Sequence, residues 1–161
     1  MIHVDISKCT GCSRCETACA FYHTGKTDRR LSRIKVMHLY DKGIDGPVVC
    51  AQCEERYCMP CPADALRIGP EGQVVVAPTV CELCGLCEER CPIGAIELAD
   101  YVVVCDLCGG EPHCVEVCTE GAITYLPEEE GPSLKELKGK TKGMNSSEKR
   151  YEYIKKEGRR R

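Results

Sequence analysis

The sequence is poor in the large side chains that usually build a protein core. Its 161 residues include no tryptophan and a single phenylalanine, Phe21, although cysteine and the aliphatic residues bring the hydrophobic share to 43%. A core with so few large side chains is marginal in a chain of this length. We therefore expect a metal, a cofactor or a partner protein to contribute to the stability of the fold.

Other features that are missing exclude whole classes of function. No apolar run approaches the ~20 residues that a membrane-spanning helix needs, so we expect no span. Residues 1–5 contain no apolar signal segment, which predicts a chain that stays in the reducing cytoplasm. No Ser–His–Asp set, phosphate-binding loop or pair of catalytic carboxylates is evident. We therefore expect no substrate chemistry from this chain itself.

Cysteine, by contrast, is abundant and regularly spaced. The chain has 16 cysteines, and they form four groups of four. These quartets are Cys9, Cys12, Cys15 and Cys19; Cys50, Cys53, Cys58 and Cys61; Cys81, Cys84, Cys87 and Cys91; and Cys105, Cys108, Cys114 and Cys118. Cysteines two residues apart face one shared concavity, so each quartet favours a metal site over cross-links between distant parts of the chain.

The spacing within the quartets indicates which metal centre is bound. The first and third quartets read C-x2-C-x2-C-x3-C, and Pro92 follows the third. This spacing is typical of bacterial ferredoxins, in which three thiolates bind one 4Fe–4S cluster and the fourth thiolate binds a different cluster. With four thiolates per cluster, 16 cysteines predict four 4Fe–4S clusters and leave none over.

Two other uses of cysteine remain as alternatives. A disulfide scaffold would suit a secreted chain rich in cysteine, but the fourfold repeat of one quartet and the absence of a signal segment oppose it. Zinc is the better alternative because C-x2-C pairs also form zinc ribbons. Zinc ribbons, however, use two separated pairs, whereas here a third cysteine soon follows each pair.

A repeat after the quartets predicts the domain organisation. The residues that follow Cys61, Cys91 and Cys118 each end in alanine and an aliphatic residue that begin a short strand. Two apolar runs around Gly-Pro-Glu-Gly in residues 66–76 predict a β-hairpin. Quartet, hairpin and quartet form the layout of a complete two-cluster ferredoxin, so residues 48–98 are predicted to be one module.

The remaining quartets are predicted to form a second module that is split by the first. We expect an α+β fold with two nested bacterial-ferredoxin-like modules, the outer one made of residues 1–47 and 99–126. The strand 2–6 should pair with the strand 122–126, and residues 33–37 should pair with residues 101–104. Nesting is preferred to a tandem arrangement because no hairpin of the 66–76 type is evident directly after the first quartet.

Nesting and the exchange of the fourth cysteine predict the ligand sets. The first set is Cys9, Cys12, Cys15 and Cys118, and the second is Cys105, Cys108, Cys114 and Cys19. The third set is Cys50, Cys53, Cys58 and Cys91, and the fourth is Cys81, Cys84, Cys87 and Cys61.

Residues 127–161 form a basic C-terminal tail. They contain 11 Lys+Arg and 7 Asp+Glu, a net charge of +4, whereas residues 1–126 contain 11 Lys+Arg and 18 Asp+Glu. Composition favours a solvated, disordered tail, and the alternative is an arm that holds a partner subunit through Tyr151, Tyr153 and Ile154. The partner-binding arm hypothesis predicts that deleting residues 128–161 weakens the complex and leaves the iron content unchanged.

The four quartets resemble the four-cluster electron-transfer subunits of molybdenum and tungsten enzymes, carbon monoxide dehydrogenases and membrane hydrogenases. The resemblance covers residues 1–126, and members of this family bind their clusters in the nested pairing. Residues 15–21, 23–25 and 32–36 look like the small subunits of tungsten aldehyde oxidoreductases. One departure is the shorter spacing between Cys58 and Cys61, where the family usually has three intervening residues.

The resemblance implies a non-catalytic subunit with four 4Fe–4S clusters. Its partners would be a large catalytic subunit with a tungsten or molybdenum pterin and, as acceptor, ferredoxin or a flavin subunit. Alternatives are a partner of a carbon monoxide dehydrogenase, hydrogenase or formate dehydrogenase, a free-standing polyferredoxin, and a zinc-bound structural module. Nucleic-acid binding is not expected, because aromatic residues that could stack on bases are scarce in the tail.

Overall fold

The fold is α+β, as the sequence predicts. A computed structural model describes residues 1–158, and within this range it contains four two-stranded antiparallel sheets and five α-helices. Short 3₁₀ helices lie between them: η1 (Ile6–Lys8), η2 (Arg29–Leu31), η3 (Tyr40–Lys42) and η4 (Leu107–Gly110). No helix among the described residues is long and apolar enough to span a membrane.

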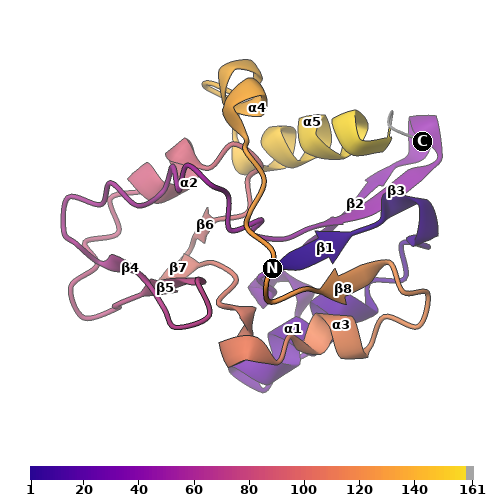
Figure 1. The fold of residues 1–161 in the computed structure, drawn as a ribbon, viewed down its shortest axis with the longest axis horizontal. Coiled ribbons are helices and arrows are strands. Elements are labelled where there is room, and N and C mark those ends of the chain that lie inside the picture. The colour runs from indigo at the N-terminus through magenta and orange to yellow at the C-terminus, as the bar shows by residue number, and fades with distance from the viewer. Residues whose placement is uncertain (159–161) are drawn as a thin grey trace.

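The outer region joins the beginning of the chain to a segment far along the sequence. Strand β1 (Ile2–Val4) pairs with β8 (Ile123–Tyr125), and Ile2 lies opposite Tyr125. Helices α1 (Arg14–Thr24) and α3 (His113–Glu116) pack against each other below this sheet in the view of Figure 1. The predicted pairing of the first and last strands is therefore confirmed.

The inner region contains the predicted hairpin. Strand β4 (Leu66–Ile68) pairs with β5 (Val74–Val76), so the hairpin predicted for residues 66–76 is confirmed. Gly72 allows the turn between the strands because its φ of 70° lies in the left-handed region. Helix α2 (Leu86–Arg90) belongs to the same region, which occupies the left-hand side of Figure 1.

The other two hairpins differ from the prediction. Strand β2 (Lys35–Leu39) pairs with β3 (Ile44–Val48), and β6 (Glu97–Leu98) pairs with β7 (Val102–Val103). The predicted pairing of residues 33–37 with residues 101–104 is therefore wrong, and a hairpin does follow the first quartet. Both observed hairpins close short local loops, which costs less chain entropy than pairing segments some sixty residues apart.

The segment after β8 packs on the body of the protein. Helices α4 (Lys135–Lys140) and α5 (Ser146–Gly158) follow it, and Leu134, Leu137 and Ile154 are buried. Helix α5 contacts β2 and β3, as Figure 1 shows. Ile154 is 0% exposed and therefore cannot anchor a partner, so this part of the arm prediction is wrong. The last three residues of the predicted tail, 159–161, lie outside the described residues.

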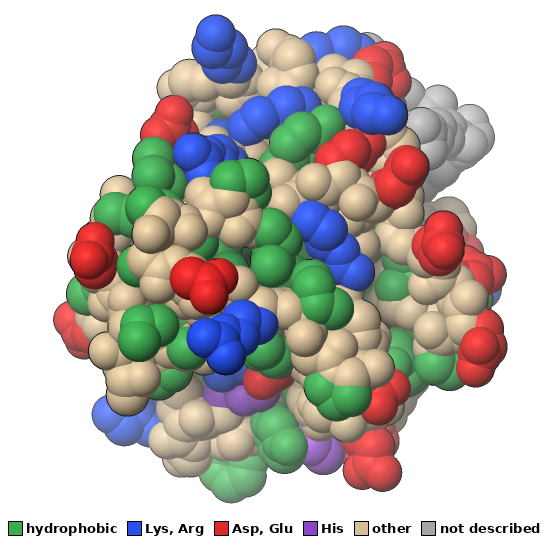
Figure 2. Space-filling model, turned by 60° about the vertical axis from the view of Figure 1, so that its left-hand side comes forward, with side chains coloured by type: hydrophobic (Ala, Val, Ile, Leu, Met, Phe, Trp, Pro, Cys, Tyr) green, Lys and Arg blue, Asp and Glu red, His purple; other side chains and the backbone are tan. Residues whose placement is uncertain are grey.

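The basic character of this segment is visible on the surface. Figure 2 looks toward the inner region, and Lys and Arg side chains gather in the upper part of this face, at the height of α4 and α5. Hydrophobic and acidic side chains lie between and below them. Residues 127–158 hold 8 Lys+Arg against 7 Asp+Glu, because three of the basic residues counted in the tail, 159–161, lie outside the described residues.

One continuous core connects all these parts. Its fully buried side chains are small and aliphatic, for example Ile34, Ile93, Ile96 and Leu107, each 1% exposed. Seven cysteines from all four quartets belong to the same buried cluster: Cys15, Cys19, Cys50, Cys58, Cys91, Cys105 and Cys114. These thiols are therefore part of the core itself.

Candidate iron–sulfur cluster sites

The four quartets share one backbone conformation. The residue two positions after the first cysteine of each quartet has a positive φ: 67° at Gly11, 47° at Gln52, 53° at Leu83 and 58° at Leu107. For a non-glycine residue this left-handed conformation costs roughly 1–2 kcal/mol. Three non-glycine residues adopt this conformation at equivalent positions despite the cost, which indicates that the surrounding structure imposes the shape of the loop. Successive N–H groups in such loops turn toward a bound group of negative charge.

A second shared conformation follows three of the quartets. Asp64, Gly94 and Gly121, each three residues after the fourth cysteine, have φ values of 50°, 65° and 61°. The alanines that follow them, Ala65, Ala95 and Ala122, are buried. The repeat seen in the sequence therefore corresponds to a repeated turn that leads the chain from a thiol into the core.

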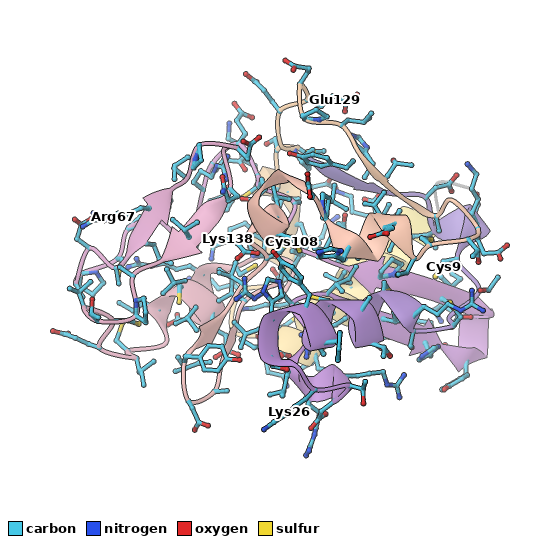
Figure 3. All side chains as sticks on the ribbon, turned by 90° about the horizontal axis from the view of Figure 1, so that it is seen from below. Cys9, Lys26, Arg67, Cys108, Glu129 and Lys138 are labelled. Carbon is cyan, nitrogen blue, oxygen red and sulfur yellow. The ribbon has the colours of Figure 1, made fainter. Side chains whose placement is uncertain are left out.

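The first predicted set lies in the outer region. Cys9, Cys12 and Cys15 line one hollow together with Cys118, which is distant in the sequence. Burial raises the pKa of the Cys15 thiol to about 12, and negative charge on Glu16, Cys9 and Cys12 acts in the same direction. Cys9 lies toward the right-hand edge of Figure 3.

The second predicted set lies between α1 and α3. Burial raises the pKa of Cys114 to about 12, with further contributions from Cys19, Cys108 and Cys15. Cys105 is buried, and its pKa is raised by burial first and then by Cys114, Cys19 and Cys108. The backbone N–H of Arg33 donates to the Sγ atom of Cys19 over 3.3 Å. Hydrogen bonds of this kind to sulfur help to set the reduction potential of a cluster.

The third predicted set is formed by the second quartet and Cys91. Burial raises the pKa of Cys58 to about 12, and charge on Cys91, Cys53 and Cys87 adds to it. Cys50 is buried, and burial and Cys91 are the two largest causes of its raised pKa. The backbone N–H of Ala95 donates to Cys91 Sγ over 3.3 Å.

The fourth predicted set lies in the inner region. Cys61 lines one hollow with Cys81, Cys84 and Cys87, so the short spacing after Cys58 does not keep it away from the third quartet. Burial is the largest cause of the raised pKa of Cys87, and Cys81 and Cys84 contribute. Leu66 lines the same hollow, and its neighbour Arg67 lies at the opposite end of Figure 3 from Cys9.

Electrostatic influences between thiols of different sets give the sets an order along the molecule. Cys15 of the first set adds to the raised pKa of Cys114 in the second. In the same way Cys105 of the second set acts on Cys50 of the third, and Cys87 of the fourth acts on Cys58 of the third. Two thiols are exposed, Cys12 in the first set and Cys84 in the fourth.

The donor groups suit an iron–sulfur cluster. All 16 cysteines have free thiols, and most of those with a raised pKa are held beside other thiols of their predicted set. Four converging thiolates would repel one another in a buried site, but a cluster core of positive charge compensates them. The structure therefore brings the members of each predicted set together. Which thiols bind which cluster remains a prediction.

The sequence alone did not single out Gln52 as a site residue. Its side chain is 4% exposed. Its Nε2 atom donates to the carbonyl of Cys105 over 3.1 Å, and its Oε1 atom accepts from the N–H of Val74 over 3.0 Å. Arg56 also donates to this Oε1 over 2.8 Å. Glutamine next to a cysteine motif carries no signal by itself, so only the fold could identify it.

A polar group beside Cys108 was also missed. The Nε2 atom of His23 lies 3.7 Å from Cys108 Sγ and 3.6 Å from the carboxylate of Asp106. Burial and the neighbouring Arg33 lower the pKa of His23, so the imidazole is neutral at pH 7. His23, Asp106 and Cys108 could share a metal ion. Arg33, however, already pairs with Asp106 over 2.5 Å, and its charge opposes a second cation.

Comparison with known proteins agrees with this geometry. Two family models described as 4Fe–4S binding domains match residues 1–24 and 74–97. The protein is 42% identical over 124 residues to an aliphatic sulfonate oxidoreductase, polyferredoxin-like subunit, of Pyrococcus furiosus, which covers 74% of this sequence and 71% of that protein. It is 32% identical over 149 residues to one chain of the anaerobic dimethyl sulfoxide reductase of Escherichia coli, covering 79% and 73%.

A third relative has a less specific name. The putative electron transport protein YsaA of Escherichia coli is 35% identical over 141 residues, which cover 78% of this chain and 88% of that protein. These likenesses define the class: the chain is a 4Fe–4S protein with ferredoxin domains. More particularly, it belongs to the family of polyferredoxin-like iron–sulfur subunits of oxidoreductases.

Proposed function

We propose that this chain is a non-catalytic electron-transfer subunit that carries four 4Fe–4S clusters in a row. The observation that carries the proposal is the order of the four thiol sets, with Cys12 exposed in the first set and Cys84 exposed in the last. Each cluster, when bound, supplies a centre that takes up and releases one electron. The protein holds these centres by the four cysteine sets named above.

The protein contributes more than ligands to this function. The aliphatic core around the thiols excludes water, and buried N–H groups such as that of Ala95 point at sulfur. Both features influence the potential at which a cluster accepts an electron. A row with one exposed thiol at each end suits the conduction of electrons between two docking proteins better than the storage of electrons in a closed core.

We further propose that the donor is a large catalytic subunit with a tungsten or molybdenum pterin, in the first place an aldehyde oxidoreductase. The support is the resemblance of residues 15–21, 23–25 and 32–36 to small subunits of such enzymes. The acceptor would be ferredoxin or a flavin subunit. A partner of a carbon monoxide dehydrogenase, hydrogenase or formate dehydrogenase is the alternative, because related subunits serve several kinds of oxidoreductase.

A free-standing polyferredoxin is the second candidate, and one observation favours it. The C-terminal segment packs on its own body through Leu137 and Ile154, so it is not held out as an arm. A stable complex would then depend on the body of the protein rather than on its tail.

Metal analysis and co-purification test these proposals together. Protein purified without oxygen should contain about sixteen iron and sixteen sulfide per chain, four of each for every cluster. Eight or fewer, or zinc in place of iron, would contradict the row of four. Co-expression of this protein with the product of the adjacent gene should yield a stable complex with a large pterin-containing subunit. A protein that remains alone under those conditions, with full iron content, supports the free-standing polyferredoxin.

A further inference from the structure

The C-terminal segment covers the third thiol set. We call residues 131–158 the C-terminal clasp. The carbonyl of Pro132 accepts from the N–H of Glu54 over 3.3 Å, and the N–H of Leu134 donates to the carboxylate of Glu55 over 3.0 Å. Gly131 approaches the backbone of Gln52 so closely that a Cβ atom would lie 1.9 Å from its carbonyl oxygen. The clasp thus lies directly on the loop that carries Cys50, Cys53 and Cys58.

The same clasp reaches the segment that carries Cys91. Gly94 approaches the carbonyl of Ser146 at the start of α5, where a Cβ atom would lie 2.2 Å away. Ser146 Oγ also donates to the carboxylate of Glu88 over 3.0 Å. All four thiols of the third set therefore lie on chain segments that the clasp contacts.

Two lysines of the clasp bind the last turn of α2, which ends at Arg90, directly before Cys91. Lys149 Nζ donates to the carbonyls of Glu88 and Glu89 over 3.1 and 2.8 Å. Lys138 Nζ donates to the carbonyl of Arg90 over 2.7 Å. These carbonyl groups lie at the C-terminal end of the helix, where lysine side chains often bind; that of Glu88 also accepts from the N–H of Cys91 over 3.3 Å.

The carbonyl groups at the end of α2 do not by themselves explain why these positive charges are buried. Lys149 is 2% exposed, and within residues 1–158 its ammonium group forms no ion pair with a carboxylate. Burying a charge without a counter-charge is costly. A five-residue helix has a weak dipole. The two lysines also repel each other: burial and then Lys149 lower the pKa of Lys138, while Cys91 and then Glu89 raise it. An uncharged side chain could bind the same carbonyls.

The neighbouring arginine serves as a comparison. Arg150 is also buried, but its guanidinium pairs with the carboxylate of Glu97 over 2.6 Å and donates to the carbonyl of Gly94. Its positive charge is therefore largely balanced within the protein. Among the buried and half-buried Lys and Arg side chains of residues 131–158, Lys138 and Lys149 form no ion pair with a carboxylate, and both lie beside the segment that connects Cys87 to Cys91.

We propose that the C-terminal clasp is the outer wall of the third cluster site and that Lys138 and Lys149 stabilise the reduced form of the cluster there. The inference rests on the proposed function, because it needs a cluster at this position. A 4Fe–4S cluster with four thiolates carries a net charge of about −2 when oxidised and one more negative charge when reduced. A nearby buried cation favours the more negative form, so it makes this cluster easier to reduce than its neighbours.

Redox titration of full-length protein reconstituted without oxygen tests the inference. Electron paramagnetic resonance would follow each cluster, and a Cys53→Ser variant would identify the signal of the third. Lys149→Gln should lower the ratio of reduced to oxidised third cluster at a fixed potential about tenfold, or ~59 mV for one electron. Lys138→Gln should act in the same direction, and Lys149→Arg should leave the ratio near that of the wild type.

Lys140→Gln is the matched control, because Lys140 is an exposed lysine of the clasp that pairs with Glu136 over 2.8 Å. If the third potential is unchanged in both Lys149→Gln and Lys138→Gln, the inference is wrong. It is also wrong if Lys140→Gln shifts the third potential as far as Lys149→Gln does. Should Lys149→Gln fail to take up iron, Lys138→Gln decides the question. Failure of the proposed function looks different, because the wild type itself would then lack iron.

Discussion

The side-chain amide of Gln52 donates a hydrogen bond of 3.1 Å to the backbone carbonyl of Cys105. Gln52 lies inside the second quartet and Cys105 begins the fourth, so this contact joins the loops of two quartets that are more than fifty residues apart. It crosses from the inner region to the outer one at the point where the second and third thiol sets meet. We therefore expect it to maintain the spacing between those two sets.

Replacing Gln52 should destabilise the protein without removing a ligand. Gln52→Leu leaves the N–H of Val74 and the carbonyl of Cys105 buried without these partners, which should cost about 2–3 kcal/mol. Urea-induced loss of cluster absorbance would measure the effect. Glu54→Gln, an exposed neighbour, is the control and should be close to neutral. Equal behaviour of the two variants would contradict the role assigned to Gln52.

Exchange of the fourth cysteine can be tested with single substitutions. Cys19→Ser should damage the cluster of Cys105, Cys108 and Cys114, because Cys19 lies beside all three in the folded chain. The cluster of the first quartet should persist, whereas Cys118→Ser should damage it. Spectroscopy of the two variants would compare the clusters. Damage to a cluster of the second quartet by Cys19→Ser would favour a tandem arrangement instead.

The C-terminal clasp should contribute to stability and to iron content. Ile154 is 0% exposed, and Ile154→Ala should lower the free energy of unfolding by about 2–4 kcal/mol, as for other buried aliphatic residues. Met144→Ala, at a half-buried position, should cost clearly less. Deleting residues 128–161 should reduce the bound iron, contrary to the expectation from sequence. Unchanged iron in the truncated chain would show that the clasp is dispensable.

Cluster uptake should become weaker as the pH falls. Burial raises the pKa of Cys15, Cys58 and Cys114 to about 12, so these thiols are protonated at neutral pH. Because ligation requires the thiolate, each thiol releases a proton when it binds iron, and acid opposes binding. Reconstitution at pH 6, 7 and 8 should give increasing cluster absorbance. Uptake that is independent of pH over this range would contradict the argument.

Local patterns predicted the parts of the fold that depend on neighbours in the sequence. The hairpin at residues 66–76 is confirmed because two apolar runs around a turn close a short loop. The pairing of Ile2–Val4 with Ile123–Tyr125 is confirmed because the ferredoxin layout requires its first and last strands to meet. The hairpin of Lys35–Leu39 with Ile44–Val48 was missed, because its second strand contains Asp45, Gly46 and Pro47, residue types that are rare in strands.

The sequence by itself determined the chemistry of this protein, because the spacing of thiols along a short loop already defines what the loop can bind. It also determined the scarcity of large core side chains, which makes the bound clusters part of the core. Only the tertiary structure decided the surroundings of each set: that Gln52 meets Cys105, that His23 lies beside Cys108, and that Lys149 is buried against α2. These contacts join residues that are distant in sequence, and no local pattern specifies such an approach.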